Sequence, residues 1–176
     1  MVYALDPANE GALVWEQRAG SGGTMGGIHY GMSANTEKLF VGVSDLPTNN
    51  PYNVGPAHPG IHALSLSTGE VLWRNDLPNQ CEEGPFLCWQ GISAAVSSTN
   101  DLVFAGGLDG ILRAFDTDDG SILWETNTRQ SFGLRNGIEA TGGSIESDGP
   151  VIVNGQVYIT YGSEKLGEAP GNVVLL

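Results

Sequence analysis

Residues Ala114 to Trp124 have the sequence AFDTDDGSILW, and the same pattern occurs at two earlier places in the chain. Residues 4–15 read ALDPANEGALVW, and residues 63–73 read ALSLSTGEVLW. Each copy has a glycine four residues before a tryptophan. The tryptophans are Trp15, Trp73 and Trp124, and the successive spacings between them are 58 and 51 residues. The spacing is near the period of about 40–50 residues that is typical of propeller blades, so the chain contains an internal repeat.

Short antiparallel strands are predicted within each repeat. In the third unit we expect strands at residues 91–96, 101–106, 111–116 and 121–126. Asp109-Gly110 and Asp119-Gly120 each stand between two β-rich runs, which is a strong hairpin signal. We therefore assign Asp109 and the acidic run at residues 116–119 to turns, and not to catalysis or a calcium loop. No segment has the 3.6-residue period of an amphipathic helix, so the chain is predicted to be all-β.

The repeat favours a β-propeller made of four-stranded antiparallel blades. Its glycine permits the positive φ that closes a hairpin, and its tryptophan is expected to pack between neighbouring blades. Residues 1–20 are expected to form the outer strands of one blade and residues 129–176 the inner strands of another. Residues 21–76 and 77–128 are expected to form two complete blades. Propellers typically close with roughly 4–8 blades, so about three blades make only part of a ring.

Both ends of the sequence lie within apolar, strand-like runs, at residues 1–6 and 171–176. We therefore expect a fragment of a longer protein that does not make a complete active site unaided. For the same reason, the lack of a basic and apolar leader at the start says little about the compartment.

Composition and charge exclude several classes of partner. Hydrophobic residues make up 40% of the chain, and its 26 glycines are about twice the usual share of ~7%. Acidic residues outnumber basic ones by 20 to 7, which gives a net charge of −13. Binding to nucleic acid or to an anionic membrane needs a basic face, so neither is expected. No apolar run reaches the ~18 residues of a membrane span.

The pattern Ala-x-Asp-x-x-x-Gly-x-x-x-Trp at residues 114–124 resembles the tryptophan-docking repeat of pyrroloquinoline quinone (PQQ) dehydrogenases. Longer phrases are similar to the C-terminal part of polyvinyl-alcohol dehydrogenase-like PQQ proteins. They include loops as well as strands and lie at residues 26–32, 92–96, 104–116, 136–144 and 170–176. The resemblance implies a quinoprotein propeller of eight blades.

The resemblance also implies a function. Such a protein is expected to hold PQQ with a calcium ion beside it, to oxidise secondary or polymeric alcohols, and to pass electrons to cytochrome c in the periplasm. In this family the metal polarises the quinone carbonyl and a carboxylate removes the hydroxyl proton, but no local motif marks that carboxylate or the calcium ligands here. One alternative is a non-catalytic PQQ-repeat propeller that acts as an assembly scaffold in the cell envelope. Another is an inactive truncated product.

Candidate cofactor-binding residues lie in three loops that lead from one blade to the next, at residues 20–31, 77–91 and 128–144. In the first loop, His29 and Tyr30 offer a hydrogen bond and a stacking face, although they can equally be ordinary channel-lining residues. In the third loop, Gly142 and Gly143 permit the close approach of a planar ligand or simply tight packing at the propeller centre.

Two further pairs of adjacent residues are candidates for cofactor binding. Trp89 with Gln90 combines an aromatic face with an amide, and Arg135 with Asn136 combines a guanidinium with an amide. An aromatic face with amide or guanidinium donors suits a tricarboxylate quinone. Each pair can equally fix one loop to another.

Cys81 and Cys88 are the two cysteines of the chain and lie in one short loop. Their spacing matches neither a Cys-x-x-Cys metal or redox motif nor a haem attachment site. A local disulfide is the simplest interpretation, and it would stabilise the loop by about 2–3 kcal/mol and indicate an oxidising compartment. Two buried free thiols are the alternative.

Overall fold

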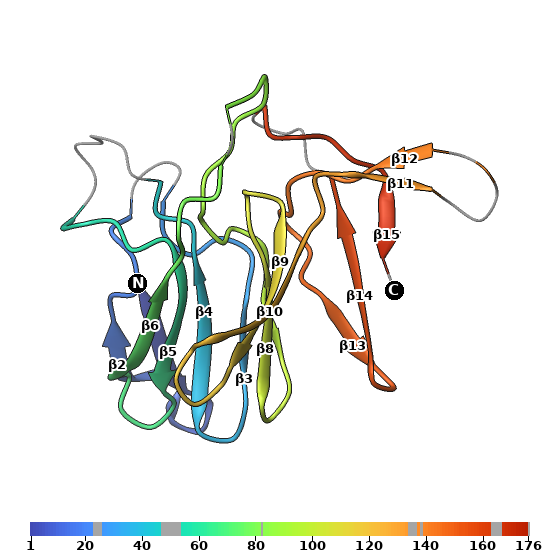
Figure 1. The fold of residues 1–176 in the computed structure, drawn as a ribbon. Helices are drawn as coiled ribbons and strands as arrows, with labels where there is room; N and C mark the ends of the chain where they lie inside the picture. Colours follow the sequence, from blue (N-terminus) through green and yellow to red (C-terminus); the bar gives the residue numbers. More distant parts are fainter. Residues whose placement is uncertain are drawn as a thin grey trace.

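The computed structural model describes residues 1–22, 26–46, 54–81, 83–133, 137, 139–162 and 167–175. Its sheets stand side by side in chain order, from β1 (Val2–Asp6) and β2 (Ala12–Gln17) at one side to β15 (Val173–Leu175) at the other (Figure 1). A 3₁₀ turn, η1 (Pro7–Asn9), joins β1 to β2. The connections between successive sheets cross at one common end, which is the upper end in Figure 1.

Two complete four-stranded antiparallel sheets form the middle of the molecule. The first has the strands β3 (Met32–Ala34), β4 (Lys38–Val43), β5 (Gly60–Ser65) and β6 (Val71–Asp76) in that spatial order. The second has β7 (Ser97–Ser98), β8 (Leu102–Gly106), β9 (Ile111–Asp116) and β10 (Ile122–Asn127). Each strand therefore pairs with its neighbour in sequence, which is the arrangement of a propeller blade.

Partial sheets flank these two. The strands β1 and β2 form a pair on one side, and β13 (Val151–Val153), β14 (Gln156–Tyr161) and β15 form a three-stranded sheet on the other. A separate hairpin of β11 (Ser131–Gly133) and β12 (Glu139–Thr141) projects from the connection between β10 and β13 (Figure 1). The all-β prediction is confirmed, and the fold is part of a β-propeller.

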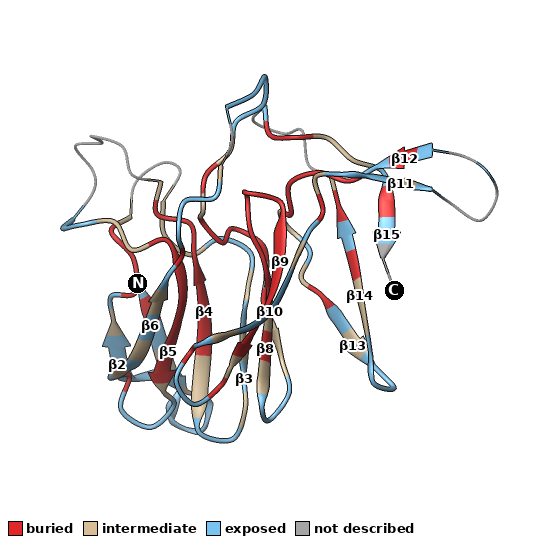
Figure 2. Cartoon of the chain, in the orientation of Figure 1, coloured by how far each residue is buried: buried red, intermediate tan, exposed pale blue. Residues whose placement is uncertain are grey.

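The hydrophobic core lies between the sheets, because each strand sends alternate side chains to opposite faces. In β4, Val41 and Val43 pack toward the β1–β2 pair, whereas Phe40 packs toward the sheet of β7–β10. A third apolar cluster, which includes Leu112 and Ile159, joins that sheet to β13–β15. Figure 2 shows the buried residues concentrated in β4, β5, β8 and β9, with exposed residues at the edges and lower turns.

The repeat tryptophans connect one sheet to the next. The indole Nε1 of Trp15 donates to the carbonyl of Leu66 at 2.9 Å, and a Cβ on Gly69 would lie 2.6 Å from the Trp15 ring. Trp73 has the same relation to the next sheet, where its Nε1 donates to the Thr117 carbonyl at 3.0 Å. The turns at Gly69 and Gly120 thus require glycine, because the indole from the preceding sheet occupies the space that a side chain would fill.

Trp124 differs from the other two. It is 49% exposed and lines an apolar pocket of about 620 Å³ together with Phe104, Phe132 and Ile159. The division into blades at residues 20, 76 and 128 stays a prediction, although the two complete sheets fall inside the ranges 21–76 and 77–128.

Residues 91–96 depart from the predicted secondary structure. They form no strand, and the first strand of that sheet is only the short β7. Ile92, Ala94 and Val96 are nevertheless buried, because they pack between sheets. Among the described residues, no helix has the length and apolar character needed to cross a membrane.

Candidate functional site

The first strands of the three neighbouring sheets lie closest to one another, since β7 contacts both β3 and β13. The Ser33 and Ser98 hydroxyls are 2.6 Å apart across the first of these contacts, and Ser97 donates to the Pro150 carbonyl across the second. In a propeller the first strand of each blade faces the central channel. The loops that enter β3, β7 and β13 therefore meet at one end of this channel.

Each of these loops has an isoleucine followed directly by a polar residue. The isoleucines, which point into the apolar layers between the sheets, are Ile28, Ile92 and Ile145. The next residues along the chain form a hydrogen-bonded row that we call the axial row, and they are His29, Ser93 and Glu146. The His29 Nδ1 lies 2.8 Å from the Ser93 Oγ, and the Ser93 hydroxyl donates to the Glu146 Oε1 at 3.3 Å.

A buried carboxylate holds the loop that carries His29. Asp45 is fully buried at the end of β4, and its Oδ2 accepts hydrogen bonds from the backbone N–H groups of Ser21 at 2.7 Å and His58 at 3.1 Å. Its Oδ1 accepts from the N–H of Gly27 at 3.0 Å. A carboxylate that accepts several backbone N–H groups is a strong local anchor, so Asp45 fixes the chain two residues before His29.

Backbone contacts fix the other two members of the axial row. The Ile92 N–H donates to the Val43 carbonyl at 3.0 Å, just before Ser93. On the far side, the Ser144 hydroxyl donates to the Leu108 carbonyl at 3.0 Å and the Ile145 N–H donates to the Gly107 carbonyl at 3.1 Å, just before Glu146. Ser93 and Glu146 are therefore positioned by hydrogen bonds between sheets, whereas His29 is positioned by Asp45 within its own sheet.

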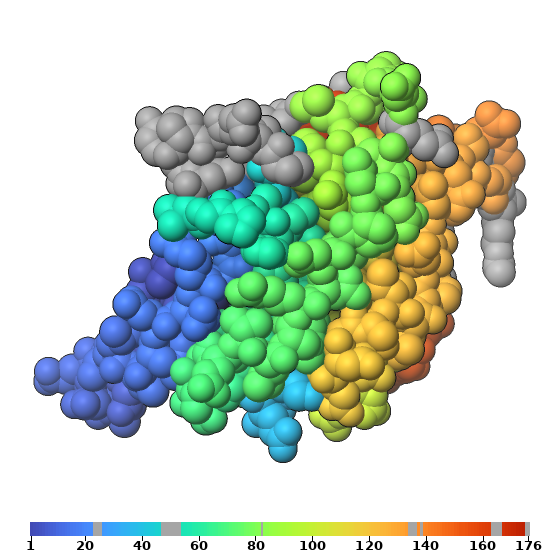
Figure 3. Space-filling view, turned by 60° about the vertical axis from the view of Figure 1, so that its left-hand side comes forward, coloured from blue at the N-terminus to red at the C-terminus, as the bar shows by residue number. Residues whose placement is uncertain are grey.

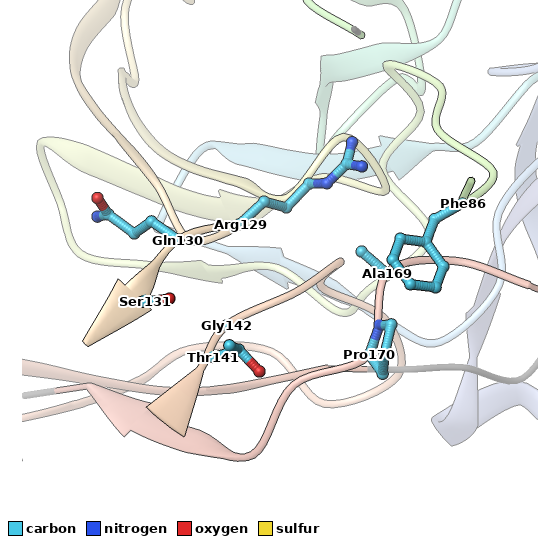
Figure 4. A pocket seen from close by; sticks show the side chains of 8 residues that line it. All are labelled: Phe86, Arg129, Gln130, Ser131, Thr141, Gly142, Ala169 and Pro170. Carbon is cyan, nitrogen blue, oxygen red and sulfur yellow. The ribbon is translucent and has the colours of Figure 1, made fainter. Parts of the chain in front are cut away.

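A pocket of about 440 Å³ lies at the same end of the molecule, and Figure 4 shows its lining. The lining residues come from the cysteine loop, from the β11–β12 hairpin and its flanks, and from the segment before β15, and they are Phe86, Arg129, Gln130, Ser131, Thr141, Gly142, Ala169 and Pro170. Arg129 extends toward the side where Phe86 lies, whereas Gln130 points away (Figure 4). Among these described residues Arg129 carries the single charge, so the pocket favours an anionic ligand.

Cys81 and Cys88 form a disulfide, with their Cα atoms 5.7 Å apart. The loop that it closes rises above the sheets, and Figure 3 shows this part of the chain projecting in light green. The Leu87 N–H donates to the Gly167 carbonyl at 2.8 Å, and Leu87 pairs with Glu168 in a parallel bridge. The disulfide loop thus reaches across to the segment before β15 and brings Phe86 to the pocket.

The two aromatic residues that are predicted to stack on a cofactor, Tyr30 and Trp89, differ in solvent exposure. Tyr30 is 45% exposed, and its ring stands edge-on to His29 with the ring centroids 6.3 Å apart. Trp89 is 6% exposed, and its indole N–H has no hydrogen-bond partner among the described residues. Gln90, next to it, is half-buried. Trp89 therefore offers a buried hydrogen-bond donor, and its role in holding a cofactor stays a prediction.

The two predicted glycines are closely packed. A Cβ on Gly142 would lie 1.9 Å from the Thr128 carbonyl oxygen and 2.3 Å from the Tyr161 ring, and one on Gly143 would lie 2.1 Å from the Ala169 carbonyl oxygen. This close packing explains why both positions need glycine, and no ligand is required to explain it. Gly142 also lines the pocket. Arg135 and Asn136 lie outside the described residues.

Burial shifts the pKa values of two titratable groups near these loops. It raises the pKa of the Tyr161 phenol to about 12, so the phenol keeps its proton at neutral pH. Its hydroxyl has no hydrogen-bond partner among the described residues. Burial also lowers the pKa of His62 to about 4, with the nearby Arg74 cation as the second cause. His62 is therefore neutral at pH 7 and belongs to the packing of β5.

Asp109 lies in the predicted turn, but its environment is not that of a surface turn. Both Asp109 and Arg113 are fully buried, and the Arg113 Nη2 and Nη1 donate to the Asp109 Oδ2 and Oδ1 at 2.6 and 3.2 Å. Asp109 also accepts from the Ile111 N–H at 3.1 Å. This buried ion pair is structural. No group of three or more metal-ligating side chains occurs among the residues with a described placement.

Sequence reasoning missed Ser93, Glu146 and most of the pocket lining. The signal for the first two was available, because aligning the three loops on Ile28, Ile92 and Ile145 puts His29, Ser93 and Glu146 at one equivalent position. Phe86 and Arg129 carry no comparable signal, since the pocket forms only when the disulfide loop crosses to another sheet.

Comparison with known proteins shows a family. The PQQ_2 family model, described as outer membrane protein assembly factor BamB, matches residues 1–169. A polyvinylalcohol dehydrogenase of Pseudomonas sp. is 38% identical over 163 residues, which make up 92% of this chain and 25% of that protein. A 1-butanol dehydrogenase (cytochrome c) of Thauera butanivorans is 30% identical over 107 residues, 61% of this chain and 14% of that protein. The chain thus spans about a quarter of the length of the polyvinylalcohol dehydrogenase.

A solved structure shows the same fold. That of the quinohemoprotein alcohol dehydrogenase ADHIIG from Pseudomonas putida HK5 matches with a TM-score of 0.55 and 21% identity, covering 81% of this chain and 18% of that one.

Proposed function

This chain belongs to the PQQ_2 family, and from that premise we propose that it is part of a PQQ-dependent dehydrogenase that oxidises secondary or polymeric alcohols. The observation that carries the proposal is the 38% identity to a polyvinylalcohol dehydrogenase over 92% of the chain. The relative named as a cytochrome c-linked 1-butanol dehydrogenase supports cytochrome c as the electron acceptor. The disulfide supports an oxidising compartment such as the periplasm.

The pocket beside the disulfide loop fits PQQ in its charge and size. Arg129 supplies a guanidinium for one of the three carboxylates, and a volume of about 440 Å³ lies in the usual range of roughly 300–1,000 Å³ for ligand pockets. The buried indole N–H of Trp89 has no hydrogen-bond partner among the described residues, although Trp89 does not line this pocket. We propose Arg129, with the predicted Trp89 and the predicted pairs His29–Tyr30 and Arg135–Asn136, as the contribution of this chain to cofactor binding.

When bound, PQQ supplies the acceptor for the two electrons removed from the alcohol. The residues of this chain have other tasks. Arg129 orients the anionic ligand, and Phe86 on the disulfide loop forms an apolar wall on one side of the pocket. A calcium site does not fit the described residues, because no suitable cluster of ligands occurs among them.

Titration of the full-length protein with PQQ, followed by the quenching of tryptophan fluorescence, tests the proposal. We expect saturable binding that Arg129→Gln weakens about 10- to 100-fold, since a hydrogen bond to a charged group contributes about 1.5–3 kcal/mol. The exposed Arg18 is the matched control, and Arg18→Gln should bind PQQ as the wild type does.

The family description favours one second candidate, a propeller that acts as an assembly scaffold in the envelope. A folded full-length protein that binds no PQQ would contradict the dehydrogenase and favour the scaffold.

A further inference from the structure

The disulfide loop ends in an exposed apolar tip. The five residues of this segment, which we call the loop tip, are all exposed, and they are Glu83, Gly84, Pro85, Phe86 and Leu87. Phe86 is 39% exposed and Leu87 is 53% exposed. Exposed loop tips usually carry small or polar residues. A run of three exposed apolar residues in such a place indicates a contact surface.

The position of the loop tip distinguishes it from other exposed apolar residues of the chain. Tyr3 and Leu5 lie in β1, and Val151 and Val174 lie in β13 and β15. These strands belong to the first and last sheets, whose free faces pack against neighbouring blades in a closed propeller. The loop tip instead projects above the sheets (Figure 3). Closure of the propeller therefore does not account for its exposure.

The loop tip is held in one place by a covalent and a backbone connection. The disulfide of Cys81 and Cys88 closes the loop. The Leu87 N–H donates to the Gly167 carbonyl at 2.8 Å, which ties the loop tip to the segment before β15. A surface that is ordered in advance loses little conformational entropy when a partner binds. The apolar side chains are therefore preorganised for contact.

The charge of the loop selects the kind of partner. Residues 81–88 contain two glutamates and no basic residue, and the chain has a net charge of −13. Complementary charges steer association and suppress wrong partners, so these charges favour a protein with a basic surface. An anionic membrane would be repelled, because membrane attraction needs basic residues.

We propose that the loop tip docks a basic electron-carrier protein, which accepts the electrons that are removed from the alcohol. The inference rests on the proposed function, because it names the surface at which that oxidation is completed. Phe86 belongs both to the loop tip and to the lining of the pocket. A carrier that covers Phe86 therefore lies directly against the pocket, and electron transfer is fastest over short distances.

The electron count fixes the stoichiometry. Oxidation of one secondary alcohol to the ketone releases two electrons and two protons. Two carriers with ferric haem each take one electron and become ferrous, and the two protons pass to water. The carrier must therefore leave after each electron, which requires a weak complex. Weak electron-transfer complexes bury less than about 1,200 Å², and a contact centred on a five-residue tip is consistent with this size.

The binding of a purified basic cytochrome c to the full-length protein without PQQ tests the docking surface by itself. Surface plasmon resonance should show a Kd that rises with salt, because salt screens exposed charges. Leu87→Ser should raise this Kd about 5- to 10-fold, the effect of truncating an important interface residue. Glu83→Lys should raise it by about the same factor, because it reverses a charge that attracts the carrier.

Two matched controls lie near the opposite end of the molecule. Leu72, in β6, is 48% exposed, and the exposed Glu37 lies in the turn between β3 and β4. Leu72→Ser and Glu37→Lys make the same chemical changes away from the loop tip. Their Kd for the cytochrome should stay within about twofold of wild type.

Turnover of the PQQ-loaded protein with a secondary alcohol separates docking from oxidation. Leu87→Ser and Glu83→Lys should reduce an artificial dye at the wild-type rate, since neither side chain lines the pocket. With the cytochrome as acceptor, their kcat/KM should fall about 5- to 10-fold.

Two results would overturn the docking surface while dye reduction by the wild type leaves the proposed function intact. One is a wild type that does not bind the cytochrome. The other is a pair of variants, Leu87→Ser and Glu83→Lys, that bind it as tightly as the wild type does. A wild type that reduces no dye with PQQ and alcohol would overturn the proposed function and the electron-transfer role together.

Discussion

The indole of Trp73 occupies the space in which a side chain at Gly120 would stand. A Cβ on Gly120 would lie 2.5 Å from the indole ring, and the Trp73 Nε1 donates to the carbonyl of Thr117 in the same turn at 3.0 Å. Trp73 lies in β6 and Gly120 follows β9, so this contact joins two complete sheets. The middle unit of the repeat, residues 63–73, therefore supplies Trp73 to one neighbouring sheet and the Gly69 turn to Trp15 of the other.

We predict that Gly120→Ala lowers the free energy of unfolding of the full-length protein by about 3 kcal/mol. About 1 kcal/mol comes from the positive φ of 75° and the remainder from overpacking against the indole. Gly155 is the matched control, since its φ is 74° and a Cβ there would meet nothing within 4 Å. Gly155→Ala should lose only about 1 kcal/mol. Urea unfolding measures both, and equal losses would contradict the tryptophan contact.

A second prediction concerns the disulfide loop. Replacing Cys81 and Cys88 by serine should speed amide hydrogen exchange at Leu87, whose N–H donates to the Gly167 carbonyl, because the open loop is less ordered. The double variant should also lose about 2 kcal/mol of stability and bind PQQ more weakly, since Phe86 lines the pocket. Unchanged exchange at Leu87 in the double variant would show that the loop is held without the disulfide.

Stability should depend on pH through His62. Burial lowers the pKa of this imidazole to about 4 in the folded protein, against 6.5 in the unfolded chain. Between these values the unfolded chain binds the proton and the folded protein does not. The free energy of unfolding should therefore fall as the pH decreases from 6.5 to 4, by about 2–3 kcal/mol in total.

His62→Gln isolates this contribution, because glutamine can still donate to the His58 carbonyl that His62 contacts at 3.0 Å. Urea unfolding at pH 7 and at pH 4.5 should show a smaller loss for the variant than for the wild type. The same loss in both proteins would assign the pH dependence to other groups.

The buried pair of Asp109 and Arg113 should behave as a coupled unit. Arg113→Met removes the cation and leaves a buried carboxylate, which should lower stability by about 3 kcal/mol. Adding Asp109→Asn removes that uncompensated charge, so the double variant should be more stable than Arg113→Met alone. A double-mutant cycle measures the coupling, and additive effects would mean that the two side chains act independently.

The propeller could be predicted because its signals are local. Glycine and tryptophan recur at a fixed spacing, and the expected strand at residues 111–116 coincides with β9. The expected strand at residues 91–96 is wrong for a physical reason. Its buried residues, such as Ile92 and Ala94, pack between sheets, and such contacts give the same apolar alternation as a strand. The β11–β12 hairpin was missed because its short strands carry no repeat pattern.

The candidate site was predictable only in part. His29 follows from its place in a glycine-rich loop, but Ser93 and Glu146 are common polar residues without a local signature. They meet His29 only because three sheets bring equivalent loops to one axis. Arg129 likewise becomes a site residue through the disulfide loop of another sheet.

The reduction of an artificial electron-acceptor dye by the full-length protein, with PQQ and a secondary alcohol, tests directly whether this protein is a PQQ-dependent alcohol dehydrogenase. We expect dye reduction that requires both PQQ and the alcohol, because the quinone accepts the two electrons that the alcohol loses. A folded protein that reduces no dye with saturating PQQ and alcohol would contradict it.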